Sequence, residues 1–132
     1  MCYLWTDIKD PHCCRRKIIL KQKPEIKSYM KPEPTTKYIC LLLVAVQLIL
    51  AVSIKEFNIY TYIIAYALGG TITQAIFLAI HESSHNLLFS NTHMNRIFAM
   101  FCNIPIIVPF CESFRYYHLL HHKYQGVDGR DS

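Results

Sequence analysis

Uncharged residues are concentrated in two long runs, and both runs predict helices. Residues 38–54 contain no charged side chain, and a helix of that length would be roughly 26 Å long. After Lys55 and Glu56, residues 57–80 form a second uncharged run, whose helix would be roughly 36 Å long. The hydrocarbon core of a bilayer is about 30 Å thick, so we expect both runs to cross a membrane, the second with a tilt.

A third apolar run, residues 97–110, is shorter and contains Pro105 and Pro109. Its helix would be about 21 Å long, too short to cross a membrane without help. Proline removes a backbone donor and clashes with the preceding turn, so the two prolines would break that helix. We therefore interpret this run as a re-entrant or interfacial segment, and a short third crossing helix is the alternative.

The net charge of +5 lies entirely at the N-terminus. Residues 1–37 carry nine basic and four acidic side chains, whereas residues 38–132 carry five of each. Basic flanks of membrane spans stay on the cytoplasmic side, so residues 1–37 should be cytosolic and Lys55–Glu56 should reach the far side. Two crossings then return residues 81–132 to the cytosol. Charge that is confined to such a flank argues against a soluble nucleic-acid-binding domain, and we expect no nucleic-acid partner.

These patterns predict an all-α fold. The chain should be a helical integral membrane protein with two transmembrane helices, a short re-entrant or interfacial segment, and cytosolic helices that carry histidines. Its expected parts are a basic segment, two spans and a cytosolic-face region, at residues 1–37, 38–54, 57–80 and 81–132.

Five of the seven histidines fall in two clusters. His81 and His85 follow the second span at a spacing of four, and His118, His121 and His122 form the second cluster at spacings of three and four. Residues three or four apart share a helix face, so each cluster can direct imidazoles at one metal ion. Because the topology places both clusters on one side of the membrane, we expect them to form a metal site.

Two metals are compatible with these residues. Residues 81–85 read H-E-x-x-H, the pattern of zinc metalloproteases, in which Glu82 would be the general base. A single zinc ion, however, needs only one further protein ligand, and the second cluster offers three. A larger set of imidazoles suits two metal ions, and imidazole is a good iron ligand. We favour iron, with an intramembrane zinc protease as the alternative.

The sequence resembles the membrane fatty-acid desaturase and hydroxylase superfamily, whose histidine boxes follow H-x(3,4)-H and H-x(2,3)-H-H. Within that superfamily it is most similar to sphingolipid delta-4 desaturases. The resemblance extends along nearly the whole chain and rests on several runs: Trp5–His12, Arg15–Leu20, Pro24–Lys27, Met30–Pro34, Leu78–Asn86, Asn103–Pro105 with Pro109, Ser113–Gly126 and Asp128–Gly129.

The resemblance implies a multi-pass enzyme of the endoplasmic-reticulum membrane. Such an enzyme introduces a double bond between carbons 4 and 5 of the sphingoid base of dihydroceramide, giving ceramide. It uses two iron ions, O2, and electrons from NADH that arrive through cytochrome b5 and its reductase. The five iron ligands that carry over are His81, His85, His118, His121 and His122. Glu82 would lie behind these ligands and orient an imidazole through its N–H group.

The sequence also departs from the family pattern. Met1–Cys2 replaces the usual Met-Gly, Thr73–Gln74 replaces an Asn-His pair, and no third histidine box follows His122. We therefore expect the chain to correspond to the N-terminal portion of the enzyme and to be inactive alone. A non-catalytic truncated membrane fragment is an alternative, and the residues leave desaturation and 4-hydroxylation equally open.

Overall fold

The structure, a computed structural model, describes residues 11–127 and 129–131. The Met1–Cys2 pair, residues 5–10 of the opening motif, and Asp128 lie outside the described residues. Every regular element in the described part is a helix, which confirms the all-α prediction. The chain divides into two compact units. One is Pro32–Arg115, and the other combines Met1–Lys31 with Tyr116–Ser132.

The larger unit begins with α2, Pro34–Ser53. Proline at the first helical position has no N–H group that would be left unpaired, and its φ already suits a helix. The Glu33 carboxylate accepts a hydrogen bond from the Thr35 N–H at 2.9 Å, which caps the first turn. This helix lies within the first of two stretches, Pro24–Ser53, that are long and apolar enough to cross a membrane.

The second such stretch, Ile59–Ser84, contains three consecutive helical segments. These are α3 (Ile59–Ile64), a π-helical segment η2 (Ala65–Gly69) and α4 (Gly70–Ser84). Asn58 starts the first of them with a capping box that it shares with Thr61. The sequence predicted one uninterrupted helix, whereas the structure widens a turn beside two glycines, where helix propensity is low.

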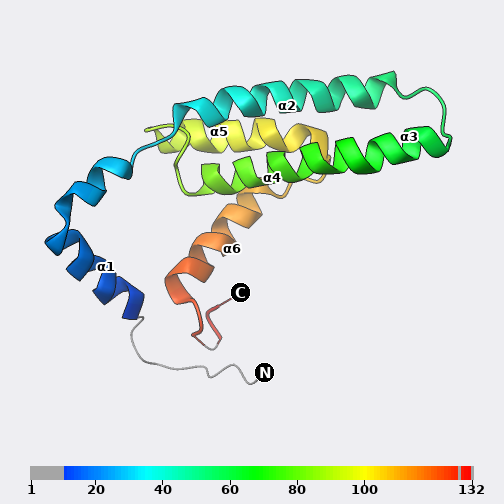
Figure 1. Cartoon of the computed structure of the whole chain (residues 1–132). Coiled ribbons are helices and arrows are strands. Elements are labelled where there is room, and N and C mark those ends of the chain that lie inside the picture. The colour runs from blue at the N-terminus through cyan, green and yellow to red at the C-terminus, as the bar shows by residue number, and fades with distance from the viewer. Residues whose placement is uncertain (1–10, 128, 132) are drawn as a thin grey trace. The chain divides into compact units, whose positions relative to one another are not determined.

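Helices α2, α4 and α5 (Thr92–Asn103) lie side by side in the larger unit (Figure 1). Their shared core is small and apolar, with Val44, Ile76, Ile80 and Cys102 as its most buried members. Large apolar side chains elsewhere on α2 and α3 remain exposed, among them Leu42, Val52 and Ile63. Exposed apolar surface over such lengths is what a helix presents to lipid.

The apolar run 97–110 is interrupted where the prolines predicted. Helix α5 ends at Asn103, a single 3-10 turn η3 (Ile104–Ile106) follows, and the chain turns sharply before α6 (Cys111–Tyr124). Asn103 organises this turn, because its Nδ2 donates to the Val108 carbonyl and its Oδ1 accepts from the Cys111 N–H. The re-entrant or interfacial placement of the run stays a prediction.

The other unit contains α1 (Pro11–Gln22), the 3-10 helix η1 (Pro24–Tyr29) and the part of α6 that follows Arg115. From Arg15 to Met30, most side chains are exposed and many are basic. Helix α6 is continuous across the two units, since it begins at Cys111 in one and ends at Tyr124 in the other.

Candidate metal centre

The first histidine pair lies at the end of α4. His81 is in the last turn of the helix, and His85 is its C-cap. Their ring centroids are 4.9 Å apart, and each ring offers a nitrogen within 4.8 Å of the other's. Asn86 follows with a φ of 60°, a conformation that asparagine tolerates better than most residues. The helix therefore ends at the pair itself, and its last turn brings the two rings together, as the spacing of four predicted.

Arg115 of α6 caps this helix end from a distance in the sequence. Its guanidinium donates hydrogen bonds to the main-chain carbonyls of Ser83 and Ser84 and to Oδ1 of Asn86. The last carbonyls of a helix have no partner within the helix, and a cation there also interacts favourably with the helix dipole. This contact joins the start of α6 to the turn that carries the first histidine pair.

Asn95 holds the loop that follows the first pair. It is completely buried, and its amide makes four hydrogen bonds with main-chain groups. The oxygen accepts from the N–H groups of Leu88 and Phe89, and the nitrogen donates to the carbonyls of Phe89 and Asn91. Because buried polar groups must be paired, this one side chain replaces the partners that the loop backbone would otherwise lack.

An aromatic cluster packs beneath His81. The ring of Phe77, one turn earlier on α4, lies 5.5 Å from that of Phe110 and 5.3 Å from that of Phe114. The ring of Phe114 also lies 6.0 Å from the imidazole of His81. The three phenylalanines bring the start of α6 against the first histidine pair and form an apolar ring cluster beside it.

The second histidine cluster lies on α6. The Nε2 atoms of His118 and His122 are 3.0 Å apart, and their ring centroids are 4.5 Å apart. The His121 ring lies 6.5 Å from that of His118, so it belongs to the neighbouring part of the same helix surface. The spacing of four predicted by the sequence thus brings two imidazoles together, whereas the spacing of three does not.

A carboxylate that the sequence analysis missed contacts the second cluster. Asp131 Oδ1 lies 2.6 Å from His121 Nδ1, and the second carboxylate oxygen accepts from the Gly126 N–H at 2.8 Å. Glu82, the carboxylate that the sequence suggested, has its Oε1 3.9 Å from His81 Nδ1, too far for a hydrogen bond. Gly126 and Gly129 lie between His122 and Asp131. They indicate a turn that could bring this carboxylate back to the histidines.

The C-terminal end of α6 is positively charged. Lys123 and Arg130 both lie over the ring of Tyr124. A hydrogen bond with Lys123, the charge of Lys123, and then Arg130 lower the pKa of Tyr124. Two cations therefore lie beside the second cluster.

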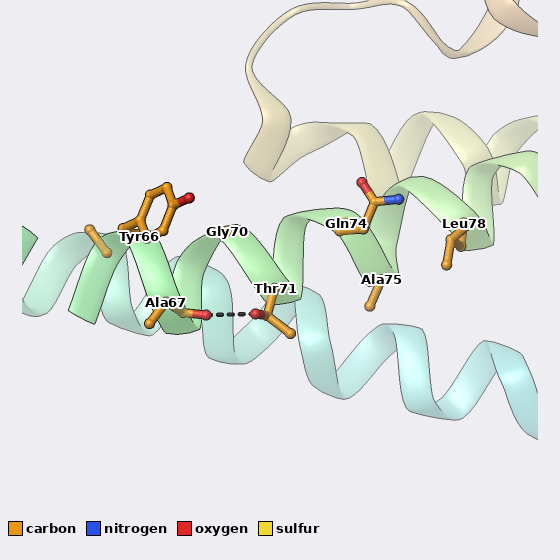
Figure 2. Close-up of a pocket in the computed structure, with 8 residues that line it drawn as sticks. Tyr66, Ala67, Gly70, Thr71, Gln74, Ala75 and Leu78 are labelled. Atoms are coloured by element: carbon orange, nitrogen blue, oxygen red, sulfur yellow. Dashed lines mark hydrogen bonds between the residues drawn. The ribbon is translucent and has the colours of Figure 1, made fainter. Parts of the chain in front are cut away.

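A groove of about 770 Å³ opens on the outer surface of the second candidate span (Figure 2). Its lining is small and mostly apolar, and it includes Ala67, Gly70, Thr71, Gln74 and Leu78. The Thr71 hydroxyl donates to the Ala67 carbonyl at 2.6 Å, so it is satisfied within its own helix. Gly70, Gln74 and Leu78 recur at steps of four, and His81 follows Leu78 by three residues, so the first histidine pair continues this helix face.

Sequence similarity to known proteins agrees with this arrangement of histidines. The sequence model of the family "Fatty acid desaturase" matches residues 57–132, which include both clusters. The chain belongs to the fatty acid desaturase family. A second model, "Sphingolipid Delta4-desaturase (DES)", matches residues 3–35 of the desaturase chain. No solved structure matches it.

Several curated relatives resemble this desaturase chain over most of its length. The sphingolipid delta(4)-desaturase of Candida albicans is 46% identical over 94% of the chain and 34% of the relative. The corresponding desaturase of Homo sapiens is 43% identical over 96% of the chain and 40% of the relative. A Caenorhabditis elegans protein whose name proposes a sphingolipid delta(4)-desaturase/C4-monooxygenase is 40% identical over 98% of the chain and 37% of the relative.

The chain thus spans between 34% and 40% of the length of these relatives. The similarity confirms the predicted family. It gives no support to the alternative of a zinc protease. Together with the two candidate spans, membership of the fatty acid desaturase family supports a membrane location.

Proposed function

We propose that this chain carries histidine ligands of a sphingolipid delta-4 desaturase, an enzyme that converts dihydroceramide to ceramide with O2. The observation that supports this proposal is that two clusters of closely spaced imidazoles lie in a chain whose named relatives are sphingolipid delta(4)-desaturases. We assign the ligands to His81, His85, His118, His121 and His122.

The donor set suits iron. Neutral imidazoles are good iron ligands, and each cluster offers two rings with nitrogens close enough to share an ion. The first pair is supported from the side by Phe114, whose ring packs on His81, and the second pair shares one face of α6 at a spacing of four. When bound, two iron ions would supply the oxidising power that an unactivated C–H bond requires.

The reaction also needs a source of electrons. Removal of two hydrogen atoms from carbons 4 and 5, with O2 reduced to two waters, consumes two further electrons and two protons. We assign their delivery to NADH through cytochrome b5 and its reductase, as the family resemblance implies. The cationic end of α6, around Lys123 and Arg130, would face the acidic donor.

The groove on the second span is suited to the hydrocarbon part of the substrate. It is mostly apolar, it lies on an exposed face of the second candidate span, and it shares a helix face with the first histidine pair. A lipid chain lying there would lead toward the iron ligands, with water excluded by Phe77, Phe110 and Phe114. We place the protein in the endoplasmic-reticulum membrane, with its N-terminus and both histidine boxes in the cytosol.

A chimera tests this proposal. Residues 1–132 would replace the matching part of the Candida albicans relative, and the product would be expressed in cells that lack delta-4 desaturase activity. We expect ceramide to form from dihydroceramide, and mass spectrometry would measure both the desaturated and the 4-hydroxylated product. Replacing His81, His85, His118, His121 or His122 singly by alanine should abolish the product.

His93→Ala is the matched control, because His93 is exposed at the start of α5 and belongs to neither cluster. It should retain the activity of the parent chimera. Normal ceramide production by the His118→Ala chimera would contradict the ligand assignment. Absence of both products in the parent chimera, despite normal expression, would contradict the proposed activity.

A further inference from the structure

Asp131 binds His121 through a short, shielded contact. Its carboxylate is only 11% exposed, whereas the His121 side chain is 39% exposed. One carboxylate oxygen lies 2.6 Å from His121 Nδ1, and the other accepts from the Gly126 N–H. Both oxygens are therefore engaged, and each has a different partner.

The backbone of the loop positions Asp131 independently of His121. After α6 ends at Tyr124, the Val127 N–H donates to the Tyr124 carbonyl, and the Asp131 N–H donates to the Val127 carbonyl at 3.0 Å. Gly126 and Gly129 adopt φ values of 78° and 70°, which glycine reaches without steric cost. These turns return the chain to the helix and bring the carboxylate to the imidazole.

A carboxylate at neutral pH can only accept hydrogen bonds. The nitrogen facing it must therefore carry the proton, which makes His121 Nδ1 the donor. In a neutral imidazole the other nitrogen then has a free lone pair. His118 and His122 direct their Nε2 atoms toward each other, so all three rings of the second cluster would offer the same atom, Nε2, to a metal.

We propose that Asp131 is a positioning residue that holds His121 in the Nδ1-protonated tautomer, leaving Nε2 as its metal-binding nitrogen. This inference rests on the proposed function, since it concerns one of the assigned iron ligands. Partners of this kind fix ring orientation and raise the basicity of the ligand, and their loss typically weakens metal binding by about 10- to 100-fold.

The tautomer can be measured without metal. The whole 132-residue chain, labelled with ¹⁵N in its histidine rings and purified in detergent, would be compared with the His121→Gln variant to assign the His121 signals. We expect the proton of the His121 ring to lie on Nδ1. A His121 ring that carries its proton on Nε2 would overturn the inference.

Asp131→Asn separates the role of Asp131 as a hydrogen-bond acceptor from simple packing. Its amide has nearly the same shape but one oxygen, so it cannot accept from both His121 and Gly126. If the oxygen stays with Gly126, the Nδ2 group donates to His121 Nδ1 and moves the ring proton to Nε2. Asp131→Glu keeps a carboxylate, and Arg130→Gln changes a charge in the same loop without contacting His121.

Metal affinity is the second readout, with Co²⁺ as the probe. We expect Asp131→Asn to weaken Co²⁺ binding roughly 10- to 100-fold, Asp131→Glu to recover part of the loss, and Arg130→Gln to bind like the parent chain. Unchanged affinity in Asp131→Asn, with an unchanged His121 tautomer, would overturn the inference. An inactive chimera whose His121 has the expected tautomer would contradict only the proposed function.

Discussion

Arg115 is the side chain that hydrogen-bonds the start of α6 to the end of α4. Its guanidinium donates hydrogen bonds to two helix carbonyls and to the Asn86 side chain, all beside the first histidine pair. Nothing in the local sequence pattern of α6 marks this arginine as different from an ordinary exposed one. Its importance comes from the long-range contact.

We predict that Arg115→Gln lowers the free energy of unfolding by roughly 2–3 kcal/mol, because hydrogen bonds to a charged group are lost and partly buried carbonyls are left unpaired. Unfolding in mixed detergent micelles would measure the change. Arg96→Gln is the control: Arg96 forms an exposed ion pair with Glu112, and exposed pairs contribute little. Equal effects of the two substitutions would contradict the assigned role of Arg115.

Ile107 is the second residue with a testable consequence. Its φ is 70°, a left-handed conformation that is costly for a β-branched side chain. The side chain is 88% exposed, so its removal sacrifices little packing within the unit. The strain is stored in the turn between the two prolines.

Ile107→Gly should therefore stabilise the protein, by roughly 1 kcal/mol. The matched control is Ile104→Gly, since Ile104 is also exposed but has a helical φ of −54°. Glycine there should destabilise by about 1 kcal/mol. Thermal unfolding of both variants would measure the two shifts, and a loss of stability in Ile107→Gly would show that the turn is not strained.

At the scale of single elements, the second candidate span departs most from its prediction. An uncharged run predicts a helix, but it does not predict the π-helical segment η2 or the groove beside it. The groove exists because small residues recur on the face that also carries His81 and His85. The same helix thus carries both the proposed lipid groove and two of the proposed metal ligands.

Gly70→Leu tests the groove. A Cβ atom at Gly70 meets nothing within 4 Å, so the larger side chain should fill the groove without disturbing the fold. We expect the chimera to prefer shorter lipid chains by roughly tenfold, because about two methylenes lose their burial at about 0.8 kcal/mol each. Competition between dihydroceramides of different chain lengths would measure this preference.

The control for this prediction is Val52→Phe, which adds bulk to an exposed position on α2 outside the groove. Its chain-length preference should equal that of the parent chimera. If Gly70→Leu also left the preference unchanged, the groove would not be part of the lipid site.

At the scale of the whole molecule, charge determines the expected orientation in the membrane. The surplus of basic residues precedes the first candidate span, and cytoplasmic flanks carry such a surplus. An acceptor site for N-glycosylation, in a Gly/Ser-rich insert between Lys55 and Glu56, should therefore be modified. The same insert after Gly129 should stay unmodified, and the reverse pattern on a gel-shift assay would contradict the orientation.

The sequence alone determined the all-α class, the two candidate spans and the spacing of the histidines within each cluster. These features depend on hydrophobicity and on the helical period, which act between residues close together in the chain. Even the break at Pro105 and Pro109 follows from local backbone chemistry.

Only the tertiary structure decided which groups surround those histidines. The packing of Phe114 on His81, the cap that Arg115 places on α4, and the approach of Asp131 to His121 join residues that are 33, 31 and 10 positions apart. Such contacts depend on how helices pack and how loops return, and no short-range period encodes them. For the same physical reason, Glu82 looked like the orienting carboxylate from its place in the motif, whereas the structure brings Asp131 to an imidazole.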